Sequence, residues 1–267
     1  MCCDYRENYF GILRYDAMQE AKEKVSGLII TFNEEKNIRE VLGCFDFCDE
    51  IIVVDSFSTD KTIDIAGEFP NAKIIQNRFE DFTKQRNLAL SYAKNDWVLF
   101  LDGDERTTPE LEKEIIDTVG DSEAKDAYFF YRTFFVGKKK INFSGTQNDK
   151  NFRLFRKSKA SYSENKKVHE TLVVNGSIGI LKNRLLHYSF ENYEHFEKKM
   201  ISYGKLKGEE LRLQGKKYSA IVQWSKVIFK FFKTYFLKLG ILDGINGLRI
   251  SYLQSLYVYE TYRTLKN

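Results

Sequence analysis

The chain has 267 residues, of which 43% are hydrophobic and 30% are charged, and its net charge is +4. This length allows one large domain, or a medium domain with an appendage, and the charge is too small to indicate a nucleic-acid partner. No apolar run reaches the roughly 18–20 residues needed to span a bilayer, and residues 1–24 lack the apolar core of a signal peptide. We therefore expect a cytoplasmic protein, with contact to a membrane surface left open.

Strand-like and helix-like segments alternate through the first half of the chain. Runs rich in apolar and β-branched residues predict four strands: Val25–Thr31, Glu50–Asp55, Ala72–Gln76 and residues 97–101. Helices are predicted between and after them: residues 36–47, a segment from the turn at 58–60 to about 69, residues 84–94, and Pro109–Val119. This alternation predicts an α/β fold with a mostly parallel, doubly wound sheet.

The pattern changes after Asp126, where strand-like segments follow one another and helices come last. The predicted strands are Ala127–Val136 and residues 151–156, 169–174 and 185–190, and the predicted helices are residues 192–214, 219–239 and 245–266. We expect three regions: an N-terminal extension (1–24), a catalytic domain (25–215), and amphipathic, membrane-associated helices (216–267).

An apolar run that ends abruptly in acidic residues, Trp97 to Glu105, is the most informative feature of the chain. The Asp102-Gly103-Asp104 sequence falls at the carboxyl end of a predicted strand, which is the edge where open α/β sheets bind ligands. Crowded carboxylates need a cation, and hard oxygen ligands select Mg²⁺ or Mn²⁺. Such an ion usually completes its shell with water and substrate phosphates, so this strand end predicts a metal-bound, phosphorylated substrate.

Polar residues also follow the first two predicted strands, at Asn33-Glu34-Glu35 and at Asp55. The ends of parallel strands meet at one edge of a sheet, so these clusters should converge on one crevice with Asp102 and Asp104. The alternative is that each cluster is a helix cap or a solvated loop.

Several of these segments, in this order and spacing, resemble glycosyltransferase family 2. The resemblance rests on residues 25–35, 52–60, 85–90 and 98–105, and it continues through 152–156 and Val168-His169-Glu170. Together with residues 238–244, these motifs look like the branch that includes lipopolysaccharide-core β-glucosyltransferases. The resemblance implies a GT-A fold, that is, a Rossmann-like, doubly wound mixed sheet, here followed by a C-terminal helical appendage.

The resemblance also implies a nucleotide-diphosphate sugar donor, with a UDP-sugar as the first expectation. Asp55 would hydrogen-bond the base, Arg86 would lie near the diphosphate, and Asp104, in the DXD motif, would ligate the metal. The implied donor-site residues are Thr31, Asn33, Glu35, Asp55, Arg86, Asp102 and Gly103, and Asp102 is also a candidate metal ligand.

An inverting transfer requires a base for the attacking hydroxyl group. The Val168-His169-Glu170 motif makes Glu170 our choice. His169 and His187 are alternates, and His187 is also a candidate metal ligand.

The predicted helix over residues 219–239 is amphipathic and basic. Its apolar side chains recur every three or four residues: Trp224, Val227, Ile228, Phe231, Phe232, Tyr235, Phe236 and Leu239. No Asp or Glu occurs between Glu210 and Asp243, whereas six lysines do. This pattern is typical of a helix lying on an anionic membrane surface. The alternative is a helix packed on the catalytic domain or in a homo-oligomer.

These observations predict a metal-dependent, inverting glycosyltransferase that is peripheral on the inner face of the plasma membrane and adds sugar to a lipid-linked envelope glycan. One alternative is transfer to a protein or peptide. A second is a non-catalytic, membrane-bound interaction module. A nucleotidyltransferase would need a Gly-rich, basic loop after the first strand, where residues 31–36 are acidic instead.

Overall fold

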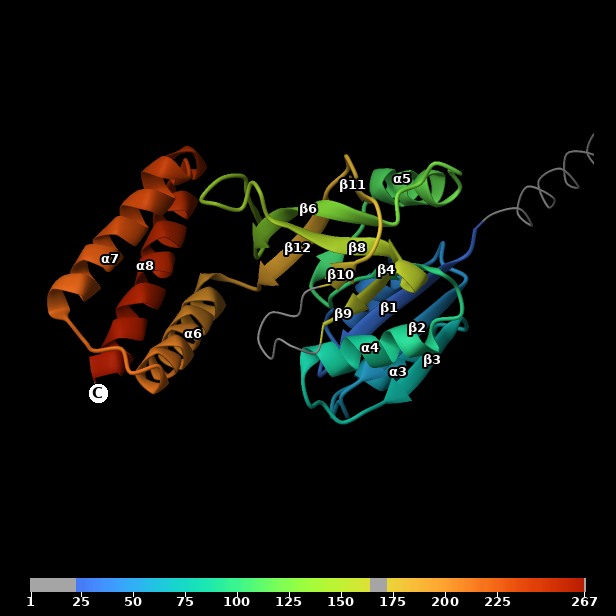
Figure 1. Cartoon of the computed structure of the whole chain (residues 1–267), viewed down its shortest axis with the longest axis horizontal. Helices are drawn as coiled ribbons and strands as arrows, with labels where there is room; N and C mark the ends of the chain where they lie inside the picture. The colour runs from blue at the N-terminus through green and yellow to red at the C-terminus, as the bar shows by residue number, and fades with distance from the viewer. Residues whose placement is uncertain (1–22, 164–171, 267) are drawn as a thin grey trace, which may run out of the picture. The chain divides into compact units, whose positions relative to one another are not determined.

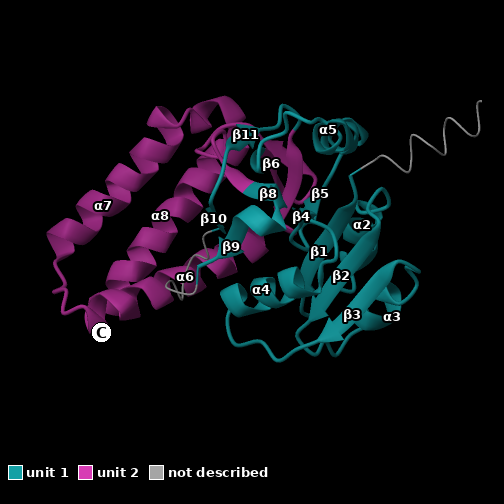
Figure 2. Ribbon diagram, turned by 45° about the vertical axis from the view of Figure 1, so that its right-hand side comes forward, with its two compact units in different colours: residues 1–130, 152–183 teal, residues 131–151, 184–267 magenta. Residues whose placement is uncertain are grey.

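The computed structural model describes residues 23–163 and 172–266 (Figure 1). The chain divides into two compact units (Figure 2): unit 1 contains residues up to 130 together with 152–183, and unit 2 contains residues 131–151 and 184 onwards. The predicted α/β class with C-terminal helices is confirmed. The expected boundary between a catalytic domain and terminal helices at residue 216 stays a prediction.

A parallel sheet forms the centre of unit 1. Strand β1 (Val25–Thr31) lies between β2 (Glu50–Asp55) and β4 (Trp97–Phe100), and β3 (Ala72–Gln76) pairs with the outer side of β2. The strands are apolar because both sheet faces are covered, and Leu28 is fully buried among side chains of β2 and β4. In this register Thr31 lies opposite Asp55, which brings two predicted site residues together.

Four helices follow the strands of unit 1: α2 (Ile38–Gly43), α3 (Thr62–Ala66), α4 (Phe82–Tyr92) and α5 (Pro109–Val119). Helix α4 begins two residues before its predicted start, because the Asp81 side chain caps it by accepting a hydrogen bond from the Lys84 backbone N–H at 2.8 Å. Helices α2 and α3 are shorter than predicted, because the chain forms hydrogen-bonded loops before each helix and i→i+3 turns after it, such as the bond from the Phe69 N–H to the Ala66 carbonyl oxygen.

Several short strands were not predicted from sequence: β5 (Glu105–Arg106), β7 (Lys139–Ile141), β9 (Ala160–Tyr162) and β11 (Ile178–Ile180). Strand β8 (Lys150–Arg156) runs antiparallel to β4, and β11 runs parallel to the first residues of β6 (Ala127–Val136). Strand β10 (Leu172–Val174) pairs with β9. The antiparallel β8 makes the sheet mixed, as expected.

Unit 2 combines strands with three long helices. Strand β12 (Leu185–Phe190) is parallel to the last residues of β6, and β7 is antiparallel to them. Helices α6 (Tyr193–Leu213) and α8 (Ile245–Lys266) pack closely, since a Cβ atom at Gly208 would lie 2.6 Å from the Thr261 carbonyl oxygen.

Helix α7 (Ala220–Phe232) ends seven residues earlier than its predicted end at 239. A π-helical turn (Lys233–Leu237) and a 3-10 turn (Gly240–Asp243) follow it, and Leu239 between them has a φ of 58°. The helical spacing of apolar residues continues through this bend, so the sequence pattern did not reveal it. Within the described part of the chain, none of the helices combines the length and apolar character needed to cross a bilayer.

Candidate active site

The carboxylate of Asp55 fastens the ends of β1 and β2. It is fully buried, and its Oδ1 accepts a hydrogen bond from Thr31 Oγ1 at 3.1 Å. The Ser58 backbone N–H donates to Oδ2 at 2.8 Å, and the Ser58 hydroxyl group also donates to Oδ1. Thr31 and Asp55 therefore meet as predicted. These bonds occupy three of the roughly four acceptor sites of the carboxylate, so one site remains for a ligand base.

The loop after β1 is held against the loop after β2. Asn33 has a φ of 55°, and its backbone N–H donates to Ser58 Oγ at 2.8 Å. Its side-chain oxygen accepts a bond from the Thr59 N–H at 2.8 Å. The exposed Glu35 side chain accepts a bond from the Lys61 N–H at 3.1 Å. Asn33 and Glu35 thus shape the rim of the site through loop contacts.

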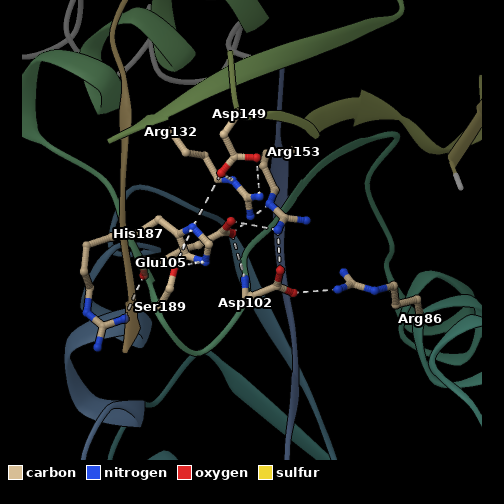
Figure 3. A network of polar contacts seen from close by, with 9 residues as sticks. Arg86, Asp102, Glu105, Arg132, Asp149, Arg153, His187 and Ser189 are labelled. Carbon is tan, nitrogen blue, oxygen red and sulfur yellow. Dashed lines mark hydrogen bonds and ion pairs between the residues drawn. The ribbon is translucent and has the colours of Figure 1, made fainter. Parts of the chain in front are cut away.

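Asp102 lies between two buried arginines (Figure 3). Its Oδ1 accepts a bond from Arg86 Nη2 at 2.6 Å, and its Oδ2 accepts a bond from Arg153 Nη2. The Arg86 guanidinium group also lies over the rings of Phe100, at 4.6 Å, and Tyr162, at 5.5 Å. Burial disfavours the charge on Arg86, but Asp102 outweighs it and raises the pKa of Arg86. The predicted diphosphate ligand Arg86 is thus an ion-pair partner of Asp102 in this structure.

Glu105 also holds Asp102 in place, through its contacts with Arg153 and with the Asp102 backbone. It was not predicted as a site residue. It is fully buried and pairs with Arg153, with Oε1 2.7 Å from Nη2 and Oε2 2.7 Å from Nε. Its carboxylate also accepts a bond from the Asp102 backbone N–H at 3.1 Å. Arg153 belongs to the 152–156 motif, and a charged residue inside that apolar strand was the signal that could have identified it.

A second acidic group is formed by Glu34 with Asp104. The Glu34 carboxyl group lies close to Gly103, since a Cβ atom at Gly103 would lie 3.0 Å from its carboxyl carbon, and a side chain there would require Glu34 to shift. Burial is the main reason that the pKa of Glu34 is raised, and the charges of Asp104 and Asp60 add to the effect. Asn37 and Arg106 oppose it. The negative charge of Asp104 therefore acts on Glu34 from nearby.

A divalent cation at this site would need several oxygen ligands. Within residues 23–163 and 172–266, no group of three or more His, Cys, Asp or Glu side chains is arranged to hold a metal. Mg²⁺ and Mn²⁺ are often held by only one or two carboxylates, with phosphates and water as the other ligands. Asp104 and Glu34 fit this description. Asp102 fits less well, because both of its oxygens already accept bonds from arginines.

His187 belongs to unit 2, where it contacts Asp149 and Ser189 (Figure 3). The Ser189 hydroxyl group lies 2.9 Å from His187 Nε2, and Asp149 Oδ2 lies 3.8 Å from Nδ1. Arg132 forms two hydrogen bonds with Asp149, at 3.0 and 2.8 Å. Burial acts to raise the pKa of Asp149, but the bonds from His187 and Arg132 lower it to about 2. The predicted base Glu170 and its neighbour His169 lie outside the described residues.

Comparison with known proteins places this geometry among sugar-transferring enzymes. The model of the family described as "Glycosyl transferase family 2" matches residues 26–175. An uncharacterised glycosyltransferase of Rickettsia typhi is 33% identical over 241 residues, which cover 84% of this chain and 80% of the relative. The lipopolysaccharide core biosynthesis glycosyltransferase LpsC of Rhizobium meliloti is 24% identical, over 90% of this chain and 93% of its own.

Among solved structures, S. aureus TarS 1-349 in complex with UDP-GlcNAc is similar with a TM-score of 0.52. The match has 19% identity and covers 91% of this chain and 92% of that one. This likeness concerns the fold, and it confirms the predicted GT-A architecture.

Proposed function

This chain belongs to glycosyl transferase family 2, and we propose that it moves a sugar, with inversion, from a UDP-sugar to a hydroxyl group of a lipid-linked envelope glycan. The observation that supports this proposal most strongly is that Thr31, Asp55, Asp102 and Asp104 lie at or just after the ends of the adjacent parallel strands β1, β2 and β4, inside the segment that the family model matches. The UDP-GlcNAc complex of TarS supports the choice of donor, and the name of LpsC supports the choice of acceptor.

The donor binds along the strand ends of unit 1 in this proposal. Asp55 accepts a hydrogen bond from the uracil ring at its remaining acceptor site. Asp102 is oriented by Arg86 and Arg153 toward the ribose. Since two guanidinium groups neutralise Asp102 and Glu105, the site presents an oriented oxygen acceptor with little excess charge to the donor.

Asp104, assisted by Glu34, would hold Mg²⁺ or Mn²⁺ next to the donor diphosphate. When bound, such an ion supplies Lewis-acid stabilisation to the negative charge that grows on the departing nucleoside diphosphate. The like-charge effect of Asp104 on Glu34 supports this assignment, because a cation removes the repulsion.

Removal of the acceptor proton falls to Glu170 in this proposal, with His169 as its alternate. A carboxylate within hydrogen-bond reach of the attacking hydroxyl group accepts the proton as the new bond to the sugar forms. The assignment rests on the family motif at residues 168–170. His187 is the less favoured base and metal ligand, because Asp149 and Ser189 lie beside its ring nitrogens.

A donor-binding experiment tests the central claim. UDP, UDP-sugars and GDP are titrated by calorimetry with Mn²⁺ or with EDTA. A UDP-sugar should bind best, and EDTA should weaken its binding at least tenfold. Asp104→Asn should remove the metal effect, whereas Asp64→Asn, on the exposed face of α3, should preserve it. Absence of binding by every nucleotide sugar, or equal binding in EDTA, would contradict the proposal.

The acceptor brings the enzyme to the cytoplasmic face of the plasma membrane, where the C-terminal helices of unit 2 contact anionic lipid. Helix α7 packs on α8, with the Trp224 and Tyr259 ring centroids 5.9 Å apart. Four and eight residues after Trp224, on the same face and beside Tyr252 and Leu256 of α8, Ile228 remains 65% exposed and Phe232 47% exposed. An exposed apolar patch of this kind is typical of an interaction surface.

The positive charge around the exposed apolar face of α7 favours an anionic membrane, rather than a second copy of the chain, as its partner. The six lysines between residues 211 and 242 are accompanied by no acidic residue. Burial, together with Lys238 and Lys233, lowers the pKa of Lys230. A second copy would bring these like charges together, whereas anionic lipid compensates them.

Vesicle co-sedimentation tests the membrane contact. The parent protein should bind anionic vesicles better than neutral ones, and salt should weaken the binding. Ile228→Glu with Phe232→Glu should abolish it without lowering the melting temperature, since both side chains are exposed. Leu206→Glu, 60% exposed on α6, is the matched control. No binding of the parent protein would contradict the proposal, and a dimer lost in the double variant would favour a homo-oligomer.

A further inference from the structure

A polar cavity of about 290 Å³ lies within unit 2, and none of the residues assigned to the donor lines it. Most of the side chains around it are hydrogen-bond donors with a positive charge or an amide group. None of the described residues that line it is an Asp or a Glu. The principal lining residues are Arg132, Thr133, Lys140, Asn142, Gln147 and Arg184.

The two arginines of this cavity are held in place. Arg132 forms the paired hydrogen bonds with Asp149 that are described above. Arg184 Nη1 donates to the Arg132 carbonyl oxygen at 3.2 Å, and its guanidinium carbon lies 5.3 Å from the centroid of the Tyr131 ring. Asp149 balances one positive charge, so Arg184 and the exposed Lys140 leave the lining positive overall. Fixed donors of this kind suit a bound oxyanion.

The wall formed by residues 142–147 is shaped by the turn at 238–244, a motif with no role in donor binding. The Asp243 carboxylate accepts bonds from the backbone N–H groups of Asn142, at 3.0 Å, and Phe143, at 2.9 Å. The Lys238 carbonyl oxygen accepts a bond from the Gln147 side chain at 3.1 Å. Asp243 is therefore a positioning residue for the cavity wall.

We propose that this cavity binds an oxyanion, phosphate or carboxylate, carried by the glycan acceptor. The identity of the ligand as an acceptor rests on the proposed function, whereas the affinity for an oxyanion rests on the cavity alone. The arginines and Lys140 meet the anion, and the amides of Asn142 and Gln147 suit the neighbouring sugar hydroxyl groups. An uncharged glycan would bring no negative charge to Lys140 and Arg184, whereas an oxyanion compensates both.

The test is a titration followed by NMR of backbone amides, using inorganic phosphate, glucose 6-phosphate, glucuronate and glucose as probes. Both charged sugars should shift the amides of residues 140–147 and bind at least tenfold more tightly than glucose. The tighter of the two identifies phosphate or carboxylate as the natural group. Equal shifts with glucose, or no shift in this segment, would overturn the proposal.

Variants locate the binding. Arg184→Gln and Lys140→Gln change exposed side chains, and each should weaken glucose 6-phosphate binding about tenfold, as expected for loss of a charged hydrogen bond. Lys138→Gln and Lys182→Gln, at exposed positions outside the cavity lining, are charge-matched controls and should leave it unchanged. Equal losses in the controls would show only diffuse attraction and overturn the site.

The positioning role of Asp243 has its own readout. Asp243→Asn should weaken glucose 6-phosphate binding and alter the amide shifts of Asn142 and Phe143, while UDP titrations remain unchanged. UDP is titrated into every sample, so that a failure of the oxyanion-site proposal can be distinguished from a failure of the donor-site proposal. Binding of UDP without glucose 6-phosphate overturns the oxyanion site, and the reverse overturns the donor assignment.

Discussion

Replacement of Arg153 is the sharpest test of how the acidic motif is supported. Arg153 is 3% exposed and pairs with Asp102 and with Glu105, which is 0% exposed. Arg153→Met keeps most of the volume but leaves Glu105 as a buried carboxylate without this partner. Removing one member of a buried ion pair costs about 3–5 kcal/mol, which is a large part of the stability of a typical domain. Arg153→Lys should cost less, because one ammonium group still compensates the charge but cannot fork onto two carboxylates.

The assay is denaturant unfolding of each variant with UDP titrations alongside. Arg156→Met on the same strand is the matched control, since Arg156 is 24% exposed and lies 3.6 Å from Asp96. A partly exposed pair of this kind contributes about 0–1 kcal/mol. Adding Glu105→Gln to Arg153→Met should restore part of the lost stability. If Arg153→Met unfolds at the same denaturant concentration as Arg156→Met, the reasoning about this cluster is wrong.

Three further predictions concern individual carboxylates. Glu170→Gln should lower the transfer rate by about 10²–10⁴ fold with donor affinity unchanged, and an equal loss of donor binding would refute its role as base. Asp149→Asn should lower the free energy of unfolding by about 2 kcal/mol near neutral pH, because the pKa of Asp149, about 2, lies below its ordinary value. This contribution is present above about pH 4 and is lost as the pH falls toward 2. Unfolding curves measured at both ends of that range check it. Glu34→Gln should stabilise the metal-free protein near neutral pH but not in acid, because the pKa of Glu34 is raised and stability therefore falls as the pH rises through that pKa. An equal gain in the free energy of unfolding at acidic pH would contradict the raised pKa.

The strands that hold the site could be predicted from sequence because their signals are local. The bounds of β1, β2 and β3 agree with the prediction, since each is an apolar run ended by polar residues. The strands β5 and β7 contain two and three residues and owe their formation to pairing with distant segments, which a local pattern does not encode. The bend after α7 was missed for the same reason, because Asp243 forms hydrogen bonds about 100 residues away in the chain.

The ion pairs that distinguish Asp102 from Asp104 could not be predicted from sequence. They depend on the antiparallel register of β8 on β4, in which Leu154 lies opposite Leu99. That register carries Arg153 to the end of β4 and beside Asp102, although 51 residues separate the two in the chain. The family resemblance implied that Asp104 ligates the metal and that Asp102 is a donor-site residue or a metal ligand, so both remained candidate metal ligands.

The structure instead gives the two aspartates different electrostatic surroundings. Asp102 is compensated by buried cations that the protein itself supplies, so it should stay charged and oriented with or without a metal. Asp104 adds to the negative charge felt by Glu34, so its surroundings improve when a cation arrives. Changes around Arg153 should therefore lower folding stability first, whereas Asp104→Asn should alter metal dependence first. In the proposed function, two aspartates separated by one glycine would thus divide the tasks of orienting the donor and holding its counter-ion.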